Sequence, residues 1–333
     1  MEMRGKRLVF SPGTTVRVEE SDVPEPGPRQ LLVRVARSQV SAGSELNGIR
    51  ALNAAGHGSR LSGYTTAGRV VAVGPGVEGP RPGDRVLAFG NHASHHLVDL
   101  TDEAAVPDLL PEGVSDEQAC FAVLGDVALH GVRRARLQID ESVAVFGAGV
   151  VGQLTIQFAR LSGAHPIVAV DLSQARLELS RRHGATHVVD ASVHDSQRAV
   201  REITGDIGAR AVFHCSANPR LLQTAMEAAA DRGRIILTGS APGVAEIGLQ
   251  VELLRHELTI AGSYESGVDL PHPYWPWTRR RNRAACYRLI ASGQLEVDSL
   301  VSHVARPEQA QEMYRKMERG RDDWMSIFFA WDA

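Results

Sequence analysis

Short apolar runs alternate with helical patterns through the middle of the chain. Residues 142–146 form a β-branched run typical of a buried parallel strand, and apolar residues from 151 to 161 then recur at helical spacing. The strands predicted in this way are residues 142–146, 167–170, 186–190, 210–216, 234–240 and 257–263, with later helices near 174–182, 194–203 and 219–230. Six strands separated by helices predict a doubly wound parallel sheet with two mononucleotide-binding halves.

The first hundred residues have a different pattern. Short β-branched runs such as LLVRVARSQV and GDRVLAF are broken by turns rich in glycine and proline. This spacing predicts a compact, largely antiparallel, barrel-like domain. A helical pattern then begins after Ser115, which we expect to be its N-cap.

The end of the chain predicts a return to the first domain. A helix is expected from Pro307 to Arg319, and it is followed by the apolar run SIFFAW. A lone terminal strand as apolar as this one needs a sheet to join, and the N-terminal domain is the expected host. We therefore expect an α/β protein with one domain formed by residues 1–110 and 264–333 and a second formed by residues 111–263.

A glycine motif lies between the first strand of the parallel sheet and its helix. Gly147, Gly149 and Gly152 form G-x-G-x-x-G, and Val150 and Val151 lie within it. The first glycine permits a tight turn, the second lets backbone approach a pyrophosphate, and the third lets the helix pack closely on the strand. The alternative, a purely structural glycine-rich turn, is less favoured because a strand precedes the motif and a helix follows it.

An acidic residue ends the second strand and indicates the cofactor. Asp171 lies nineteen residues after Gly152, where a carboxylate can accept hydrogen bonds from an adenosine ribose. It would repel a 2′-phosphate, so NAD is expected rather than NADP, although the nearby Arg176 weakens this preference. Further cofactor contacts are expected from Leu172, Cys215, Ser216, Thr238, Gly239 and Ser263.

Composition excludes several classes of partner. A formal charge of −3 gives no electrostatic reason to expect nucleic acid or an anionic membrane surface. Three widely separated cysteines argue for a reducing compartment. The sequence has no apolar run of membrane-spanning length and no leader pattern, so we expect a cytoplasmic protein.

Four segments resemble the medium-chain dehydrogenase/reductase superfamily. They are VSAGSEL, GYTTAGRVVAVG, PGDRV and VFGAGVVGQLTIQFARLSGA, in the order that the family has them. The resemblance covers essentially the whole chain and implies a Rossmann domain, a GroES-like β-rich domain and a nicotinamide-dependent oxidoreductase. Within the family the sequence resembles the alcohol-dehydrogenase-like branch that contains bacteriochlorophyllide dehydrogenase.

The resemblance also implies a catalytic zinc, which the residues argue against. Ala42 stands where zinc members have a cysteine, Tyr64 and Thr65 where they have a His-Glu pair, and Val123 where they have a third ligand. A catalytic zinc needs three protein ligands. We therefore expect no zinc and no metal ligands, and we interpret the segment HASHH (92–96) as a strand rather than a metal cluster.

Side chains near the expected zinc position are the candidates for acid–base chemistry. Tyr64 can donate a hydrogen bond to a substrate carbonyl or can simply fill space. Ser44 matches the family's relay hydroxyl, although Asn47 replaces the relay histidine. Glu45 contacts substrate in one interpretation and braces the domain in the other.

Two further residues are catalytic candidates. Asp126 interrupts an apolar helical face, so it is either an acid–base group beside the nicotinamide or a solvated or capping residue. His92 is either catalytic or a hydrogen-bonded strand histidine.

The loop PYWPWTRRRN contains aromatic and cationic side chains. Trp275, Trp277 and Arg279 either line the mouth of the substrate site or pack against the N-terminal domain ahead of a solvated helix. The first alternative suits a flat, carboxylated, phosphorylated or polyhydroxylated substrate.

These observations together predict a zinc-independent, NAD(H)-dependent oxidoreductase that interconverts an alcohol and a ketone on a polar or cyclic metabolite. The alternatives are a reductase of activated C=C bonds and a non-catalytic nucleotide-binding protein. The family resemblance also implies a homodimer paired through the strand ELTIAGS.

Overall fold

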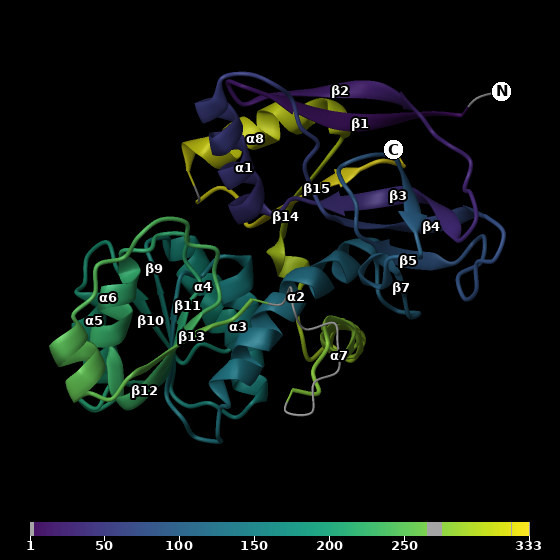
Figure 1. Cartoon of the computed structure of the whole chain (residues 1–333). Helices are drawn as coiled ribbons and strands as arrows, with labels where there is room; N and C mark the ends of the chain where they lie inside the picture. Colours follow the sequence, from purple (N-terminus) through teal and green to yellow (C-terminus); the bar gives the residue numbers. More distant parts are fainter. Residues whose placement is uncertain (1–2, 265–274, 321, 333) are drawn as a thin grey trace. The chain divides into compact units, whose positions relative to one another are not determined.

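The computed structural model of the chain describes residues 3–264, 275–320 and 322–332 (Figure 1). The chain divides into two units whose boundaries fall inside helices α2 (Asp116–Ala135) and α7 (Arg279–Ala291). Unit 1 holds residues 1–123 and 287–333, and unit 2 holds residues 124–286.

Six parallel strands form the sheet of unit 2. Their order is β10-β9-β8-β11-β12-β13, so the chain adds two strands on one side of β8 and then crosses back to add three on the other. This is the doubly wound order, and it confirms the predicted fold class. The strands are β8 (Val143–Phe146), β9 (Ile167–Asp171), β10 (His187–Asp190), β11 (Ala209–His214), β12 (Ala229–Leu237) and β13 (Thr259–Gly262).

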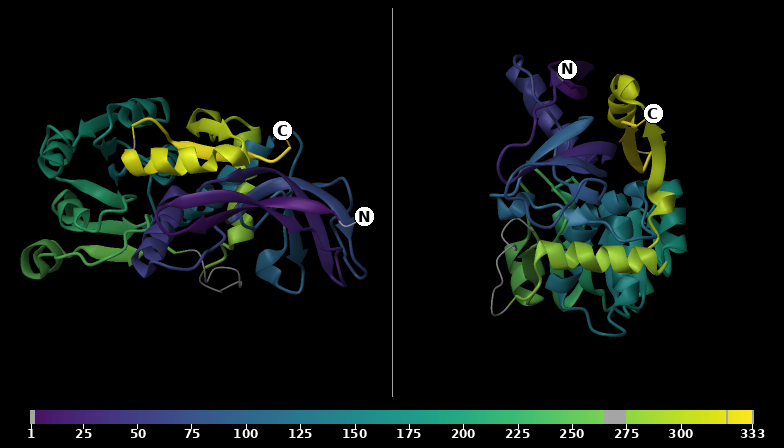
Figure 2. Two further views of the ribbon diagram at one scale, coloured as in Figure 1. Left: turned by 90° about the horizontal axis from the view of Figure 1, so that it is seen from above. Right: turned by 90° about the vertical axis from the view of Figure 1, so that its right-hand side faces the viewer.

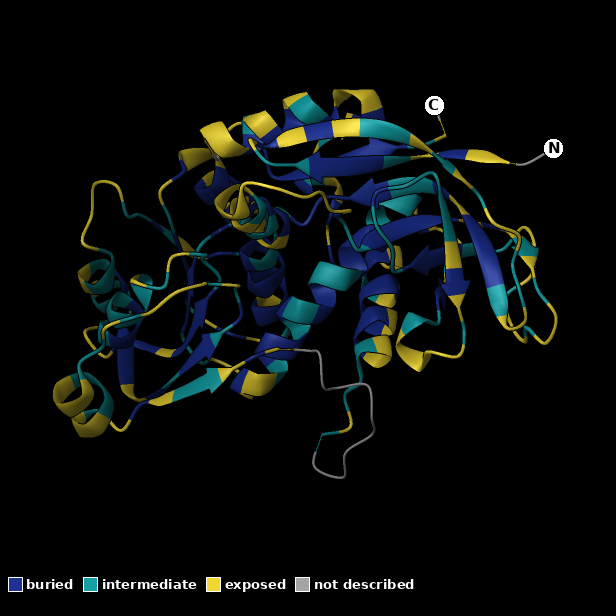
Figure 3. Ribbon diagram, turned by 45° about the horizontal axis from the view of Figure 1, so that its top comes forward, coloured by how far each residue is buried: buried dark blue, intermediate teal, exposed yellow. Residues whose placement is uncertain are grey.

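Burial explains why these short runs are strands. All four residues of β8 are buried, and a core of apolar side chains including Phe146, Val170, Val212 and Ile235 fills the space beside the sheet. In Figure 3 the central strands of this sheet are mostly dark blue. The helices are α3 (Val150–Leu161), α4 (Gln174–Arg182), α5 (Ser196–Ile203) and α6 (Leu221–Glu227), with a π-helical segment η2 (Leu249–Arg255).

Unit 1 contains a mainly antiparallel seven-stranded sheet and a separate hairpin. The sheet order is β14-β15-β3-β4-β5-β7, with β6 also paired to β3. Only β14 and β15 pair in parallel, and β1 and β2 form the hairpin. The strands are β1 (Arg4–Ser11), β2 (Thr15–Asp22), β3 (Gln30–Gln39), β4 (Thr65–Val73), β5 (Arg85–Ala88), β6 (His95–Asp99), β7 (Asp108–Leu109), β14 (Val301–Ala305) and β15 (Ser326–Ala330).

The C-terminal strand joins the N-terminal sheet, as predicted. β15 pairs antiparallel with β3, and all five of its residues are buried. The helix α8 (Ala310–Arg319), after a 3-10 turn at Pro307–Gln309, lies beside the N-terminal hairpin in both views of Figure 2. The Gln311 side chain accepts a hydrogen bond from the Val16 backbone N–H at 2.9 Å. Chain segments from both ends thus build unit 1.

Two helices differ from the predictions. The sequence analysis missed α1 (Ala42–Ala55), which buries Leu46 and Ile49. Helix α6 is shorter than expected because β12 already begins at Ala229. The short 3-10 helices are η1 (Glu103–Ala105) and η3 (Asp298–Leu300). Among the described helices, none is both long and apolar enough to span a bilayer.

Candidate functional site

The glycine turn connects the carboxyl end of β8 to helix α3. Gly147 has φ 97°, which favours glycine, and a Cβ at Gly152 would lie 1.9 Å from the Gly147 carbonyl oxygen. The helix can therefore pack this closely only without a side chain at Gly152. Gly149 is the N-cap of α3 and offers no side chain, so the first N–H groups of the helix stay available to an anion.

The Asp171 carboxylate lies at the carboxyl end of β9 and holds the turn. It accepts hydrogen bonds from the backbone N–H groups of Ala148 at 2.6 Å, Leu172 at 2.8 Å and Ser173 at 3.0 Å. The Asp171 carboxylate is thus fixed next to the glycine motif, where it would meet an adenosine ribose.

Arg176 lies on α4 and is turned towards the same motif. Its side chain is buried, and its Nη1 atom is 3.6 Å from a Cβ built on Gly149. The turn is therefore flanked by the carboxylate of Asp171 and by a guanidinium. Val150 and Val151 are half-buried in the first turn of α3, whereas Leu172 is exposed.

The other predicted cofactor residues follow the later strands of the sheet. Cys215 and Ser216 follow β11, Thr238 and Gly239 follow β12, and Ser263 follows β13. Because the carboxyl ends of parallel strands share one edge, the structure brings these positions to the edge that carries the glycine turn. Burial raises the pKa of Cys215 to about 12, so its sulfur is a thiol rather than a nucleophilic thiolate.

Helix α2 passes beside the ends of the last two strands. A Cβ at Gly131 would lie 2.8 Å from Thr238 Oγ1 and 3.5 Å from Ser263 Oγ. Both hydroxyl oxygens are buried and have no hydrogen-bond partner in the described part of the chain. A polar ligand at this edge would satisfy them.

Asp126 lies on the same helix and is 3% exposed. Its carboxylate accepts a hydrogen bond from Asn282 Nδ2 at 2.6 Å, and the Asn282 side chain also contacts Arg133. The thiol of Cys286 has a pKa well above its usual value because it is buried and lies near the Asp126 charge. The Asp126 carboxylate therefore links α2 to α7, a role that the sequence did not suggest. Its acid–base role stays a prediction.

Glu45 is the centre of a buried polar cluster in unit 1. Its carboxylate accepts hydrogen bonds from the Ser41 N–H at 2.7 Å, Ser62 Oγ at 3.1 Å and Tyr314 Oη at 2.5 Å, and it pairs with His92 Nε2 at 3.1 Å. Burial would raise the pKa of Glu45, but the attraction of His92 and these hydrogen bonds together lower it. The carboxylate is thus ionised and fully engaged.

His92 is completely buried, and its other ring nitrogen, Nδ1, lies 2.8 Å from Ser38 Oγ. These contacts favour the bracing alternative for Glu45 and the hydrogen-bonded alternative for His92. The sequence analysis missed Tyr314, Ser62 and Ser38, because no local pattern connects residues so far apart in the chain.

Tyr64 and Ser44 are more accessible than this cluster. The half-buried Tyr64 hydroxyl donates a hydrogen bond to Ser41 Oγ at 2.5 Å. Ser44 is exposed in the first turn of α1. Ser41 therefore connects the Tyr64 hydroxyl to the Glu45 cluster.

The aromatic residues before α7 pack against α2. The Trp275 ring meets the His130 ring edge-on, with centroids 5.4 Å apart, and the Trp277 ring lies under the Arg133 guanidinium. Arg279 is half-buried at the start of α7. The two tryptophans thus pack against α2 rather than against the N-terminal domain, as one of the alternatives had predicted. Residues 265–274, which include the start of the predicted loop, lie outside the described residues.

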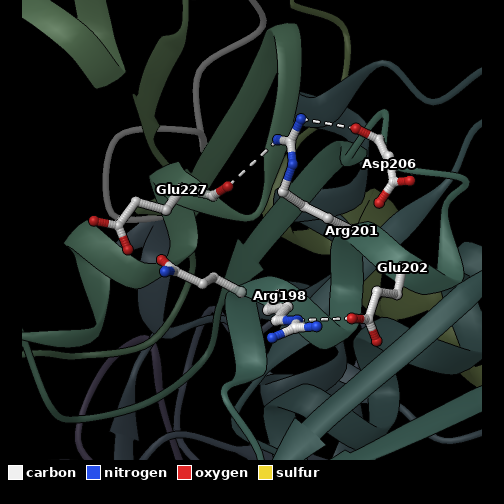
Figure 4. Close-up of a pocket in the computed structure, with 6 residues that line it drawn as sticks. Arg198, Arg201, Glu202, Asp206 and Glu227 are labelled. Atoms are coloured by element: carbon white, nitrogen blue, oxygen red, sulfur yellow. Dashed lines mark hydrogen bonds and ion pairs between the residues drawn. The ribbon is translucent and has the colours of Figure 1, made fainter.

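A separate surface pocket of about 380 Å³ lies beside α5 (Figure 4). The Arg201 guanidinium donates to the carbonyl oxygens of Asp206 at 2.8 Å and Ala229 at 3.1 Å, and Arg198 pairs with Glu202 at 2.8 Å. Asp206 and Ala229 mark the amino ends of β11 and β12. The pocket is therefore at the opposite edge of the sheet from the glycine turn and does not belong to the cofactor site.

Comparisons with known proteins agree with this architecture. The family model described as zinc-binding dehydrogenase matches residues 150–278. The L-threonine 3-dehydrogenase of Pyrococcus horikoshii is 27% identical, over 93% of this chain and 94% of the relative. The sorbitol dehydrogenase of Bacillus subtilis is 24% identical, over 97% of this chain and 96% of the relative. The crystal structure of galactitol-1-phosphate dehydrogenase from Escherichia coli superposes with a TM-score of 0.82 at 24% identity, covering 98% of this chain and 99% of that one.

The chain belongs to the medium-chain dehydrogenase/reductase superfamily, with a Rossmann sheet in unit 2 and a GroES-like sheet in unit 1. It is an enzyme of the dehydrogenase/reductase class, and the comparisons support NAD(P) as its cofactor.

The comparisons contradict the expectation of a zinc-free protein. The matching family model is described as zinc-binding, and a relative from Escherichia coli, 25% identical, is described as a zinc-type alcohol dehydrogenase-like protein. Within the described part of the chain, no three His, Cys, Asp or Glu side chains gather to hold a metal ion. No zinc ligand is therefore assigned among the described residues.

Proposed function

We propose that the protein is an NAD(H)-dependent oxidoreductase that interconverts an alcohol and a ketone on a polar or cyclic metabolite. The relatives named as L-threonine, sorbitol and D-guloside dehydrogenases support the reaction class. The observation that supports the choice of cofactor is the glycine turn with the Asp171 carboxylate hydrogen-bonded beside it. When bound, the nicotinamide supplies hydride transfer.

The preference for NAD over NADP follows from charge. A 2′-phosphate at the Asp171 carboxylate would meet a fixed negative charge, which the nearby Arg176 offsets only in part. The test is titration with NADH and NADPH. Tighter binding of NADH in the wild type, and a gain of NADPH affinity in Asp171→Asn, would support the proposal. Equal or stronger NADPH binding in the wild type would contradict it.

We assign proton handling to hydroxyl groups of unit 1. The Tyr64 hydroxyl turns its single proton from Ser41 Oγ to the substrate oxygen and so polarises it, and the exposed Ser44 hydroxyl passes the proton. A donor aimed at a developing oxyanion is worth about 3 to 4 kcal/mol. Tyr64→Phe should therefore lower kcat about 10²-fold or more while the NADH affinity stays unchanged. Unchanged turnover would remove Tyr64 from the reaction.

Asp126 is the second acid–base candidate, and Asp126→Asn tests it. The amide keeps the side-chain shape, and it can still accept the hydrogen bond from Asn282 while losing the titrating group. An acid–base role requires a changed pH profile of kcat. A bracing role predicts an unchanged profile with a lower free energy of unfolding.

A substrate screen separates this function from its two rivals. Turnover of secondary alcohols with NAD supports the proposal, and turnover of enones or quinones alone supports a C=C reductase. Tight NADH binding without turnover of either class supports a non-catalytic binder. In both enzymatic cases residues 1–110 and 264–333 are proposed to supply the substrate side and residues 111–263 the cofactor side.

We also propose a cytoplasmic homodimer that pairs through the edge strand β13. Exposed apolar side chains lie in the segment that leads to this strand, with Val244 86%, Leu249 64% and Leu254 71% exposed. Burial of such side chains favours association. Fractionation of the expressing cells tests the compartment.

A further inference from the structure

Two tryptophans before α7 are held among arginines. The guanidinium carbon of Arg133 is 3.7 Å from the centroid of the Trp277 ring, and that of Arg281 is 4.7 Å from it. The guanidinium carbon of Arg134 is 5.8 Å from the centroid of the Trp275 ring. We call Arg133, Arg134, Trp275, Trp277 and Arg281 the Trp–Arg wall.

Positive charge is concentrated at this wall. Residues 127–139 and 275–286 contain seven arginines and no acidic residue, although the whole chain has a formal charge of −3. The buried Asp126 carboxylate next to the first segment is held by Asn282. Burial is the main cause that lowers the pKa of His130 to about 4, and the charges of Arg134 and Arg133 lower it further.

The wall begins near the edge of the sheet that carries the proposed cofactor site. Trp275 contacts His130, and the next residue, Gly131, lies against Thr238 and Ser263 at the carboxyl ends of β12 and β13. One helical turn, about 5.4 Å, separates His130 from Arg134. A ligand at the carboxyl ends of β12 and β13 would therefore lie close to the wall.

Two ring nitrogens at the wall have no hydrogen-bond partner among the residues that the structure describes. His130 Nδ1 and Trp275 Nε1 are buried without a hydrogen bond, and His130 is 5% exposed. An indole N–H can only donate, so its partner must be an acceptor such as an oxyanion. The exposed side chains of Arg134 and Arg281 can meet the same anion from solvent. Guanidinium groups bind carboxylate and phosphate oxygens in a bidentate manner.

We propose that the Trp–Arg wall binds an oxyanionic group of the substrate, a carboxylate or a phosphate. This inference rests on the proposed function, because it assigns the anion to the alcohol or ketone that the enzyme converts. The substrate is then a hydroxy acid or a phosphorylated alcohol rather than a neutral polyol. Cation–π contacts hold Arg281 against Trp277 and Arg134 against Trp275, and the anion meets these two exposed guanidinium groups.

The test uses inorganic phosphate and malonate as probes on the full-length protein. Tryptophan fluorescence is titrated with each anion at constant ionic strength, with and without saturating NADH. Wild type, Arg281→Gln and Arg134→Gln are compared with Arg182→Gln, which removes an exposed arginine on α4 away from the wall. Trp277→Phe shows how much of the fluorescence change comes from Trp277 rather than from the other tryptophans.

Saturable quenching by either anion is expected in the wild type, with a Kd about five-fold higher in Arg281→Gln and Arg134→Gln and unchanged in Arg182→Gln. The anion that binds more tightly identifies the phosphate or carboxylate source. Absence of saturable binding, or equal weakening in Arg182→Gln, would overturn the inference. The NADH titration tests the proposed function separately. A wild type that binds NADH but neither anion would contradict the anion site at the wall and leave the proposed function unaffected.

Discussion

The role of Glu45 could be predicted from the sequence only in part, because its partners lie far apart in the chain. The sequence indicated that this carboxylate either braces the domain or contacts substrate. Its partners come from α1, from the segments around Ser62 and His92, and from α8, and Tyr314 is 269 positions away. Buried polar clusters of this kind depend on three-dimensional packing, so neither periodicity nor spacing could have identified them.

Removing the Glu45 carboxylate should destabilise unit 1. Glu45→Ala leaves His92, Ser62 and Tyr314 buried without their partner, and breaking a buried pair costs about 3–5 kcal/mol. Urea unfolding followed by circular dichroism measures the change. The exposed Glu78→Ala is the control and should change stability by less than about 0.5 kcal/mol. Similar values for the two variants would show that the cluster contributes nothing.

Among the elements, strand and helix order was more predictable than helix position. The six strands of unit 2 were predicted because buried parallel strands are continuous apolar runs. Helix α1 was missed because Gly43 and Gly48 interrupt its interior and only Leu46 and Ile49 bury apolar side chains. The N-cap of α2 was predicted correctly, since the Ser115 hydroxyl accepts a hydrogen bond from the Gln118 N–H at 3.1 Å.

The junction of β8 and α3 allows no side chain at Gly152. A methyl group there would collide with the Gly147 carbonyl oxygen, which is backbone and cannot rotate away. Gly152→Ala should cost about 1–3 kcal/mol of stability and weaken NADH binding at least about ten-fold. Calorimetric titration with NADH measures the affinity. Gly320→Ala, where a Cβ meets no atom within 4 Å, should match the wild type.

The C-terminal half of α2 should make stability depend on pH. His130 has a pKa of about 4 when folded, below its ordinary value of 6.5. Between these values the unfolded chain binds a proton that the folded chain does not, so stability is complete above about pH 6.5 and falls as the pH drops towards 4. Unfolding curves across this range should have a smaller pH slope for His130→Phe than for the wild type. The exposed His194→Phe is the control, and parallel curves for all three proteins would contradict the assignment.

For the whole molecule, the comparisons and the fold agree on the superfamily, whereas the expectation that the protein lacks zinc was wrong. Ala42, Tyr64, Thr65 and Val123 stand at the expected ligand positions, and none of them suggested a zinc ligand. The family description overturned that expectation. The substrate side is harder to predict than the cofactor side, because the glycine motif is local in sequence while the candidate side chains lie in distant segments.

The proposed dimer gives a prediction at the scale of the whole molecule. If β13 pairs with its copy, the apolar residues near it become buried, and Leu254→Lys should shift the mass measured by light scattering from dimer towards monomer. Val193→Lys changes another exposed apolar residue, 71% exposed in a different segment of unit 2, and should leave the mass unchanged. A monomeric wild type at micromolar concentration would contradict the proposed dimer.

The position of β15 between β14 and β3 has a consequence for biosynthesis. All the strands of unit 2 are made before residues 326–330, so the nucleotide half can fold while the ribosome is still at work. Residues 1–123 must wait, with the backbone edge of β3 at residues 37–39 unpaired, until β15 emerges. Chaperones that shield such edges would therefore act on the part of the polypeptide that is translated first.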